Sequence, residues 1–304
     1  MKRAAQRGVA VVTAILVVAV AASAASYMLS QQSATLNQTA LVAARAQAGL
    51  DWARGILAED ARKSATDTLE EGWAQPLAGL PVERAVVSGA IIDLQSRFNL
   101  NNVVKDGQRS EAGVRVLARL LESLGLDAGL ALAVLDWVDA DADLAGNGGA
   151  EDAFYLARAR PHRAANRPMT QVEELYSVRG FDARSVAALR PFVTALPVRT
   201  PVNANTAPAE VLAALLPALS RDEIRALVDS RRKEAFRDRA DLQTRTKKTG
   251  ASAIDTDLDV KSDHFLVQVG VAQDDVQVAT EALVARAAPG AAPATAIIWR
   301  RPLY

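Results

Sequence analysis

The chain has 304 residues, half of them hydrophobic, and its 35 basic residues balance 35 acidic ones. This length allows a sizeable core and two domains, and the balanced charge leaves no basic footprint for nucleic acid. Cysteine is absent, which excludes disulfides and thiol chemistry. There is no P-loop, HExxH or GxSxG motif, and the two histidines, His162 and His264, are far apart in the sequence. We therefore expect a protein that is not an enzyme.

The N-terminus combines basic charge with a long apolar run. Lys2, Arg3 and Arg7 precede Gly8, and residues 9–29 are dominated by Val, Ala, Ile and Leu. A helix of that length is roughly 30 Å long, which is the thickness of the hydrocarbon core of a bilayer. We therefore predict a single membrane span, with the basic N-terminus in the cytoplasm and the bulk of the chain outside it.

Two cleavage positions fit this segment. Ala22-Ser23-Ala24 has the small residues of a secretory signal-peptide site, and cleavage there would leave a chain that starts near Ala25. Alternatively, the basic leader that ends at Gly8 resembles the leader of type IV pilins and pseudopilins. That resemblance implies cleavage by prepilin peptidase after Gly8 and methylation of the new N-terminus at Val9. Loss of residues 1–8 would leave 32 basic against 35 acidic residues, a formal charge of −3.

The helical pattern continues past the membrane segment. Residues 30–60 contain no proline, and we expect one helix over 9–60 that spans the membrane and continues as a stalk. The apolar positions that recur at helical spacing include Leu36, Ala40, Ala43, Ala44, Ala48, Trp52 and Leu57. Small residues allow close packing of helices in a fibre, and a plain membrane anchor with an amphipathic stalk is the alternative.

Strand signals flank a helical block. We interpret residues 82–104 as a hairpin punctuated at Gly89 and at 99–102, residues around Gln273-Asp274-Asp275 as another hairpin, and Ala296 to Arg300 as a last strand. Successive helices are predicted between them, including 113–124 and 128–138. We therefore predict an α+β fold in which residues 61–109 and 251–304 form one domain with the N-terminal helix. An all-helical domain over 110–250 is inserted into it.

Two motifs in this arrangement carry a specific resemblance. Residues 93–101 read DLQSRFNLN, and residues 136–141 read DWVDAD. Together with the leader, the long helix and the helical insertion, they resemble the type II secretion system protein K family, which are minor pseudopilins. The resemblance implies a type IV pilin-like fold in a bacterial inner-membrane protein whose bulk is periplasmic. It also implies a place at the tip of the pseudopilus, where the chain would initiate or cap assembly for export of folded proteins across the outer membrane.

The same resemblance implies partners and a role for Thr13. The partners would be minor pseudopilins I and J, with H as a further one, together with prepilin peptidase and the inner-membrane secretion platform. Most pilins and pseudopilins have Glu as the fifth mature residue, where its carboxylate meets the N-terminal amine of a neighbouring subunit. Here that residue is Thr13. A carboxylate without a partner is costly in lipid, so its absence fits a capping subunit that has no subunit ahead of it. An ordinary helix residue is the alternative.

An acidic loop is the candidate for metal binding. Asp139, Asp141 and Asp143 alternate, Gly146-Asn147-Gly148-Gly149 allows a turn, and Glu151 and Asp152 follow. Carboxylates on a flexible loop suit Ca²⁺, although the EF-hand spacing is not met because Leu144 occupies the glycine position and Glu151 is one place late. The family resemblance also implies calcium. We expect these five carboxylates to hold a structural Ca²⁺, and a solvated acidic loop is the alternative.

Two helix–turn–helix patterns, over 169–193 and 205–232, define a different hypothesis. Each has the spacing of a capping box, at Thr170 and Glu173 and at Ser220 and Glu223. Such pairs resemble helix-hairpin-helix modules that grip DNA phosphates, so a membrane-anchored DNA-binding protein for DNA uptake is the alternative function. The second hairpin lacks glycine, and Pro217 removes a backbone donor. We therefore expect no nucleic-acid partner.

Overall fold

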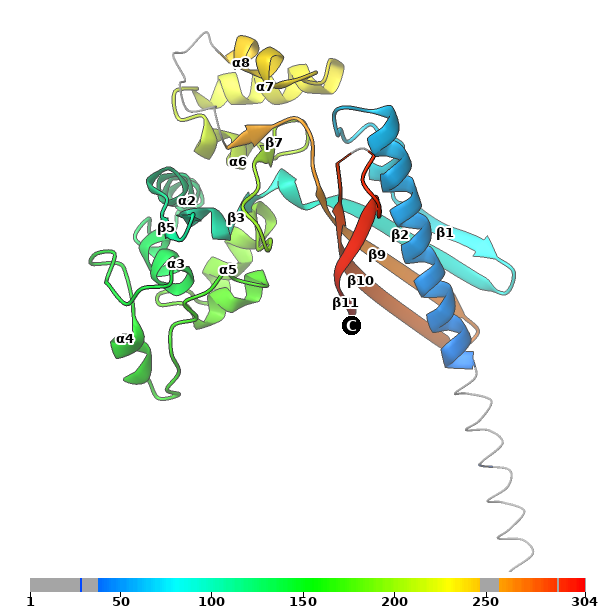
Figure 1. Ribbon diagram of the computed structural model, residues 1–304, viewed down its shortest axis with the longest axis horizontal. Helices are drawn as coiled ribbons and strands as arrows, with labels where there is room; N and C mark the ends of the chain where they lie inside the picture. The colour runs from blue at the N-terminus through cyan, green and yellow to red at the C-terminus, as the bar shows by residue number, and fades with distance from the viewer. Residues whose placement is uncertain (1–27, 29–37, 247–256, 289, 304) are drawn as a thin grey trace, which may run out of the picture.

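The computed structural model describes residues 28, 38–246, 257–288 and 290–303 (Figure 1). The predicted processing site at Gly8 and Val9, Thr13 and, except for Met28, the predicted membrane span lie outside these residues. Among the described helices, none has the length and apolar character needed to cross a membrane.

A helix over residues 38–63 lies across one face of a five-stranded antiparallel sheet (Figure 1). The strand order is β1-β2-β9-β10-β11, so strands from two distant parts of the chain pair in one sheet. The bounds are β1 Leu77–Val82, β2 Ala85–Asp93, β9 His264–Gln273, β10 Val276–Arg286 and β11 Thr295–Pro302. Pairing between β2 and β9 joins the two parts.

Among the described apolar positions that recur at helical spacing, only Leu57 packs against the sheet, and the others are exposed. The buried side chains are Val42, Ala46, Leu50, Ala53 and Leu57, which pack with valines of β9. Ala44 and Ala48 are exposed, and Trp52 is 58% exposed. Alanine occurs on several sides of this helix, so the composition alone does not show which side the sheet covers.

Two predicted elements of the sheet are confirmed. The chain turns between β9 and β10 at Asp274 and Asp275, where Gln273 pairs with Val276. The last predicted strand is β11, which pairs with β10. Strand β9 alternates buried and less buried residues because one face of the sheet packs on the helix.

The predicted hairpin over 82–104 is wrong. The hairpin is formed by β1 and β2 and turns at Glu83 and Arg84, while Gly89 lies inside β2 and pairs with Val269 of β9. Strand β1 contains Gly79 and Pro81, which are unfavourable in a strand interior, and it escaped prediction for that reason. The structure tolerates them because β1 is an edge strand.

Residues from Phe98 to Val260 have a core of their own. The predicted helices at 113–124 and 128–138 are confirmed as α2 and α3. The helices are α2 Glu111–Ser123, α3 Leu130–Val138, α4 Asp152–Leu156, α5 Ala183–Leu189, α6 Ala209–Leu215, α7 Arg221–Lys233 and α8 Arg239–Thr246. Short 3-10 helices are η1 Gly72–Ala74, η2 Leu94–Ser96, η3 Leu100–Val103, η4 Val172–Ser177 and η5 Arg190–Phe192. We call residues 98–260 the helical segment.

The helical segment extends beyond the predicted limits of 110 and 250. Strand β3 (Phe98–Asn99) pairs in parallel with β6 (Val193–Thr194), and β7 (Val202–Asn203) pairs in parallel with β8 (Leu258–Asp259). A small hairpin, β4 Val104–Lys105 with β5 Gln108–Arg109, precedes α2. These pairings place the flanking residues in the core of the helical segment, because buried backbone N–H and C=O groups need hydrogen-bond partners.

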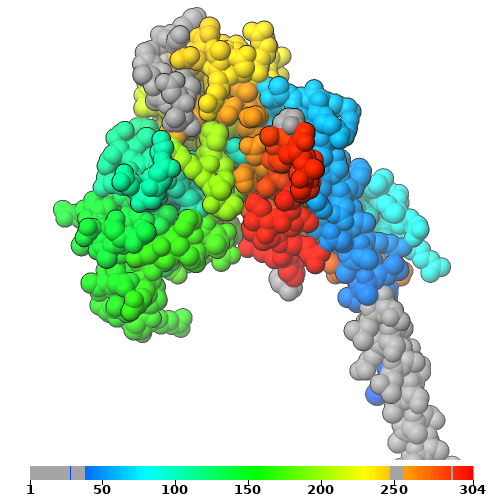
Figure 2. Space-filling model, in the orientation of Figure 1, coloured from blue at the N-terminus to red at the C-terminus, as the bar shows by residue number. Residues whose placement is uncertain are grey.

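The helical segment and the sheet meet at a buried polar run. The carboxylate of Asp93, at the end of β2, accepts hydrogen bonds from the Thr206 and Ser262 hydroxyls at 2.6 and 2.7 Å. The side-chain Nδ2 of Asn101 donates to the backbone carbonyls of Met169 and Leu196, and its Oδ1 accepts from the backbone N–H of Met169. Figure 2 shows the two parts in contact along their upper edge and separated by a notch below.

Candidate functional site

The acidic loop connects the end of α3 to the start of α4. Asp139 follows the last residue of α3, and its amide donates to the Leu135 carbonyl. Glu151 precedes the first residue of α4. Both ends of the loop are therefore held by helices, and the carboxylates of these two residues lie within reach of each other.

Three carboxylates converge in this loop. One oxygen each of Asp139, Asp141 and Glu151 lies within 4.8 Å of the others. The other two predicted ligands are not part of this group. Asp143 is exposed, and its amide donates to Asp141 Oδ1 at 2.9 Å. Asp152 accepts a hydrogen bond from the Ala164 amide at 3.0 Å and pairs with Arg163 at 3.7 Å, so it orders a neighbouring loop.

Several oxygens of this group are buried with no hydrogen-bond partner in the part of the chain that the structure describes. They are Oδ1 of Asp139 and both carboxylate oxygens of Glu151, and Oδ2 of Asp136 shares this property. The prediction missed Asp136, which lies beside this group in the last turn of α3. It is three residues before Asp139, the residue that follows α3, so the short spacing could have indicated that the two carboxylates are neighbours.

Burial and mutual repulsion perturb these acids. Burial raises the pKa of Asp139 to about 7, and the charge of Asp141 adds to the effect. Burial likewise raises the pKa of Glu151 to about 7, with a further contribution from Asp136. The pKa of Asp136 is raised by burial as well, although backbone amides of the loop donate to its carboxylate. A nearby cation would favour the ionised form of these buried carboxylates and offset their mutual repulsion.

Glycines in the loop allow the backbone to come close to the acids. A Cβ atom at Gly149 would lie 2.1 Å from Oδ2 of Asp136, and one at Gly148 would lie 2.5 Å from the Gly129 carbonyl oxygen. Arg179 holds the same turn by donating to the Gly149 carbonyl at 2.6 Å. Of the glycines that the sequence marked as a turn, Gly149 therefore allows close packing against Asp136 and Gly148 against Gly129.

The residues present fit a hard divalent cation. The group offers only oxygen ligands. Its buried oxygens that have no hydrogen-bond partner among the described residues could coordinate a cation. Buried carboxylates without a partner are costly, so a bound cation would stabilise the loop.

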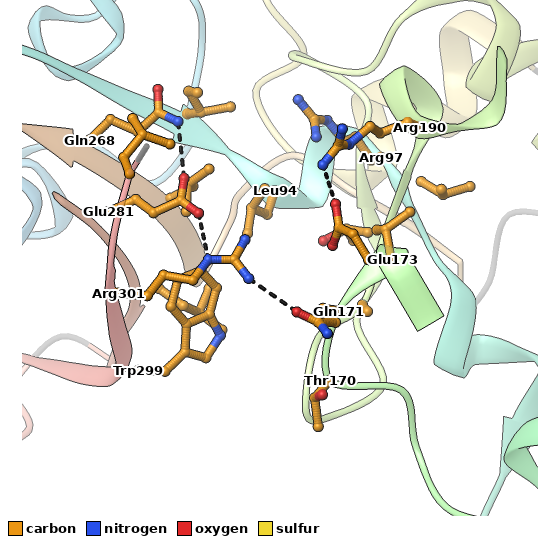
Figure 3. A pocket seen from close by; sticks show the side chains of 18 of the residues that line it. Leu94, Arg97, Thr170, Gln171, Glu173, Arg190, Gln268, Glu281, Trp299 and Arg301 are labelled. Carbon is orange, nitrogen blue, oxygen red and sulfur yellow. Dashed lines mark hydrogen bonds and ion pairs between the residues drawn. The ribbon is translucent and has the colours of Figure 1, made fainter. Parts of the chain in front are cut away.

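A groove of about 740 Å³ separates the sheet from the helical segment (Figure 3). The face of the sheet that does not contact the N-terminal helix forms one wall. Arg301 pairs with Glu281 at 2.6 Å and donates to Gln171 at 3.1 Å, so β11 is tied to the helical segment across the groove. Arg190 pairs with Glu173. Each ion pair satisfies charges within one wall, and the Arg301–Gln171 hydrogen bond joins the two walls.

The two helix–turn–helix patterns differ from prediction in one detail. The capping box of Ser220 and Glu223 is confirmed at the start of α7. At the first pattern, Thr170 contacts Glu174 instead of Glu173, because the 3-10 helix η4 begins at Val172 and its N-cap is Gln171, not Thr170.

Comparison with known proteins gives a consistent result. The family described as type II secretion system protein K matches residues 96–198 and 202–261. Curated relatives with that name include a Pseudomonas aeruginosa protein, 32% identical over 87% of this chain and 84% of the relative. A Klebsiella pneumoniae protein is 33% identical over 88% of each chain. A chain from the crystal structure of the GspK-GspI-GspJ complex of enterotoxigenic Escherichia coli has a TM-score of 0.76 at 23% identity. It covers 90% of this chain and 99% of that one.

These matches identify the class to which the protein belongs. The protein is a minor pseudopilin of the type II secretion system, a structural component of a machine that spans the cell envelope. Within that class, the chain belongs to the type II secretion system protein K family. The DNA-uptake alternative is not supported, because the relatives are secretion components.

Proposed function

We propose that this minor pseudopilin has a type IV pilin-like fold interrupted by an inserted helical domain, and that it caps or initiates the pseudopilus at its tip. The observation that carries the proposal is the arrangement of the 38–63 helix on a sheet whose strands flank the helical segment in sequence. A large body beside the sheet would obstruct the addition of a further subunit above it.

The partners follow from the same proposal. The chain of similar fold was crystallised in a complex with GspI and GspJ. We infer that minor pseudopilins I and J bind this chain, that prepilin peptidase cuts it between Gly8 and Val9, and that residues 9–29 span the inner membrane. The bulk of the chain would be periplasmic. Minor pseudopilin H and the inner-membrane platform would be further partners. Thr13 would suit a subunit with no neighbour ahead of it.

Two measurements test the assembly proposal. Mass spectrometry of the mature protein is expected to find a methylated N-terminus at Val9, and a chain that starts near Ala25 would overturn it. Purified pseudopilins I and J are expected to form a stable ternary complex with this protein. Salt-sensitive DNA binding without such a complex would contradict the proposal.

We also propose that Asp139, Asp141 and Glu151 hold a structural Ca²⁺, with Asp136 beside them. The support is their convergence and their unpartnered buried oxygens. A cation bound only by the folded state stabilises it by about 2.7 kcal/mol at 100 times the dissociation constant. For a chain of this size that corresponds to roughly 5 to 10 °C in melting temperature.

A variant pair makes the calcium test specific. Glu151→Gln is expected to abolish both calcium uptake in calorimetry and the calcium-dependent rise in melting temperature. Asp143→Asn is the matched control, because Asp143 lies on the same loop but outside the converging group. If the two variants respond to calcium equally, the assignment of ligands is wrong.

A further inference from the structure

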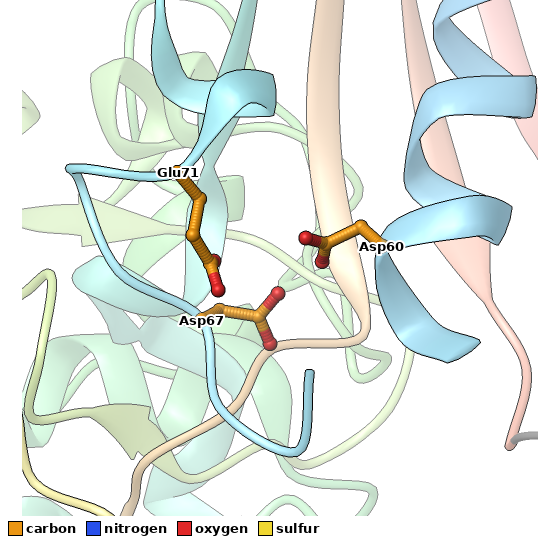
Figure 4. Close-up of side chains that lie close together, drawn as sticks. All are labelled: Asp60, Asp67 and Glu71. Carbon is orange, nitrogen blue, oxygen red and sulfur yellow. The ribbon is translucent and has the colours of Figure 1, made fainter. Parts of the chain in front are cut away.

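A second group of acids lies at the far end of the N-terminal helix. One carboxylate oxygen each of Asp60, Asp67 and Glu71 lies within 4.8 Å of the others. Figure 4 shows how they converge: Asp60 comes from the last turn of the helix, Asp67 from the loop that follows, and Glu71 from the start of η1. This group is separate in sequence from the acidic loop.

Asp67 is held rigidly, its carboxylate lies toward the other two acids, and one of its oxygens has no partner among the described residues (Figure 4). Its side chain is 1% exposed, and its Oδ1 is buried with no hydrogen-bond partner among the described residues. The backbone around it is fixed, because its amide donates to the Val260 carbonyl at 3.0 Å and its carbonyl accepts from Asn203 at 3.1 Å. A buried acceptor without a donor is costly and needs a ligand.

Arg286 compensates only part of the negative charge. Its guanidinium pairs with Oδ2 of Asp60 at 2.8 Å and Oδ2 of Asp67 at 2.5 Å. Asp67 Oδ2 also accepts from the Ser262 amide, so the partners of Asp67 gather at one oxygen and leave Oδ1 free. Three carboxylates against one guanidinium leave two negative charges, which is the charge that a divalent cation neutralises.

The remaining contacts position Glu71. Its Oε2 accepts hydrogen bonds from the Thr68 amide at 2.9 Å and from Trp73 Nε1 at 2.8 Å. Burial and the neighbouring charges of Glu71 and Asp67 raise the pKa of Asp60 to about 6. The group is thus short of positive charge although it contains an arginine.

We propose that Asp60, Asp67 and Glu71 form a second divalent cation site, of the calcium class, which ties the end of the N-terminal helix to the loop and to β10. Calcium–oxygen distances of about 2.3 to 2.6 Å let one ion contact three oxygens that lie within 4.8 Å of each other, with water completing the shell. Arg286 is itself buried and orients Asp60 and Asp67 through its ion pairs with them. The site is independent of the proposed loop site and of the proposed place at the tip.

Terbium luminescence tests this site, because Tb³⁺ takes calcium ligands and is sensitised by a nearby tryptophan. Trp73 contacts Glu71 directly. The experiment uses the full chain in neutral detergent with Asp139→Asn and Glu151→Gln, which disable the loop site. We expect one Tb³⁺ per chain, sensitised emission that calcium displaces, and loss of that emission in Trp73→Phe while equilibrium dialysis still detects binding.

Substitutions of the three acids show whether Tb³⁺ binds at this group. Asp67→Asn is expected to weaken Tb³⁺ binding about tenfold or more. Glu71→Gln keeps an acceptor for Trp73 and is the milder variant if Asp67→Asn does not fold. Glu70→Gln is the matched control, because Glu70 is adjacent, exposed and outside the group. No binding in the loop-disabled chain, or equal binding by the Glu71→Gln and Glu70→Gln variants, would overturn the proposal. Equal stoichiometry in the wild type and the loop-disabled chain would instead count against the loop site.

Discussion

Helix α2 lies so close to η3 at Gly113 that a side chain at this position should lower the free energy of unfolding. A Cβ atom there would lie 2.1 Å from the carbonyl oxygen of Asn102, and real Cβ contacts essentially never fall below 3.0 Å. The Asn102 side chain donates to the Thr200 carbonyl at 2.8 Å, which holds that backbone in place. In Gly113→Ala, α2 therefore has to move away from η3 by about 1 Å, and it loses packing against the core.

The expected change in the free energy of unfolding of Gly113→Ala is the sum of two opposing effects. Overpacking of this kind typically costs about 1 to 3 kcal/mol, and the rigid backbone of Asn102 places Gly113 at the upper end. Replacing glycine by alanine inside a helix contributes about 1 kcal/mol in the other direction. The net expectation is a loss of about 2 kcal/mol in the free energy of unfolding. For a denaturant dependence of about 2 kcal/mol per molar urea, the midpoint falls by about 1 M.

Gly55 supplies the matched control. It lies in the helix over 38–63, and a Cβ atom there would meet nothing within 4 Å. Gly55→Ala should therefore gain up to about 1 kcal/mol from helix propensity alone. Both variants are compared with the wild type by urea unfolding, followed by far-ultraviolet circular dichroism. A Gly113→Ala midpoint equal to or above that of the wild type would refute the close approach and the packing of α2 derived from it.

Three further predictions concern buried or capping polar groups. Burial raises the pKa of Asp93 from 3.8 to about 6, so the fold favours its protonated form. The resulting stabilisation, about 3 kcal/mol at most, is complete below pH 3.8 and is lost as the pH rises through 6. Asp93→Asn should remove that dependence, and stability curves that stay parallel to those of the wild type from about pH 4 to about pH 7.5 would contradict it. Asn101→Ala should cost about 2 to 4 kcal/mol in urea unfolding, because it leaves two buried carbonyls and one amide without their partner; a loss below about 1 kcal/mol would speak against this network. Ser220→Ala should cost about 1 kcal/mol through loss of the α7 cap, whereas Ser123→Ala, at the other end of a helix, should change little.

Local patterns in the sequence account for much of the fold. The turn at Asp274 and Asp275, strand β11, helices α2 and α3 and the cap at Ser220 all depend on residues a few positions apart, so periodicity and turn chemistry were enough to predict them. The acidic loop was also visible, because its carboxylates and glycines are close in sequence.

Other features depend on residues that only folding brings together. The face of the N-terminal helix that contacts the sheet was not predicted, because alanines on several sides give no strong periodicity. Strand β1 was missed because its glycine and proline suit an edge strand, and edge position is a property of the sheet.

The acidic groups show the same division. The sequence by itself determined that Asp139, Asp141 and Glu151 share one loop and that the chain resembles a family of minor pseudopilins. Only the tertiary structure decided which carboxylates converge, and that Arg286 reaches Asp60 and Asp67 from more than 200 positions away. The physical reason is that burial and electrostatic coupling depend on distances in space, which sequence spacing fixes only within a helix, a turn or a short loop.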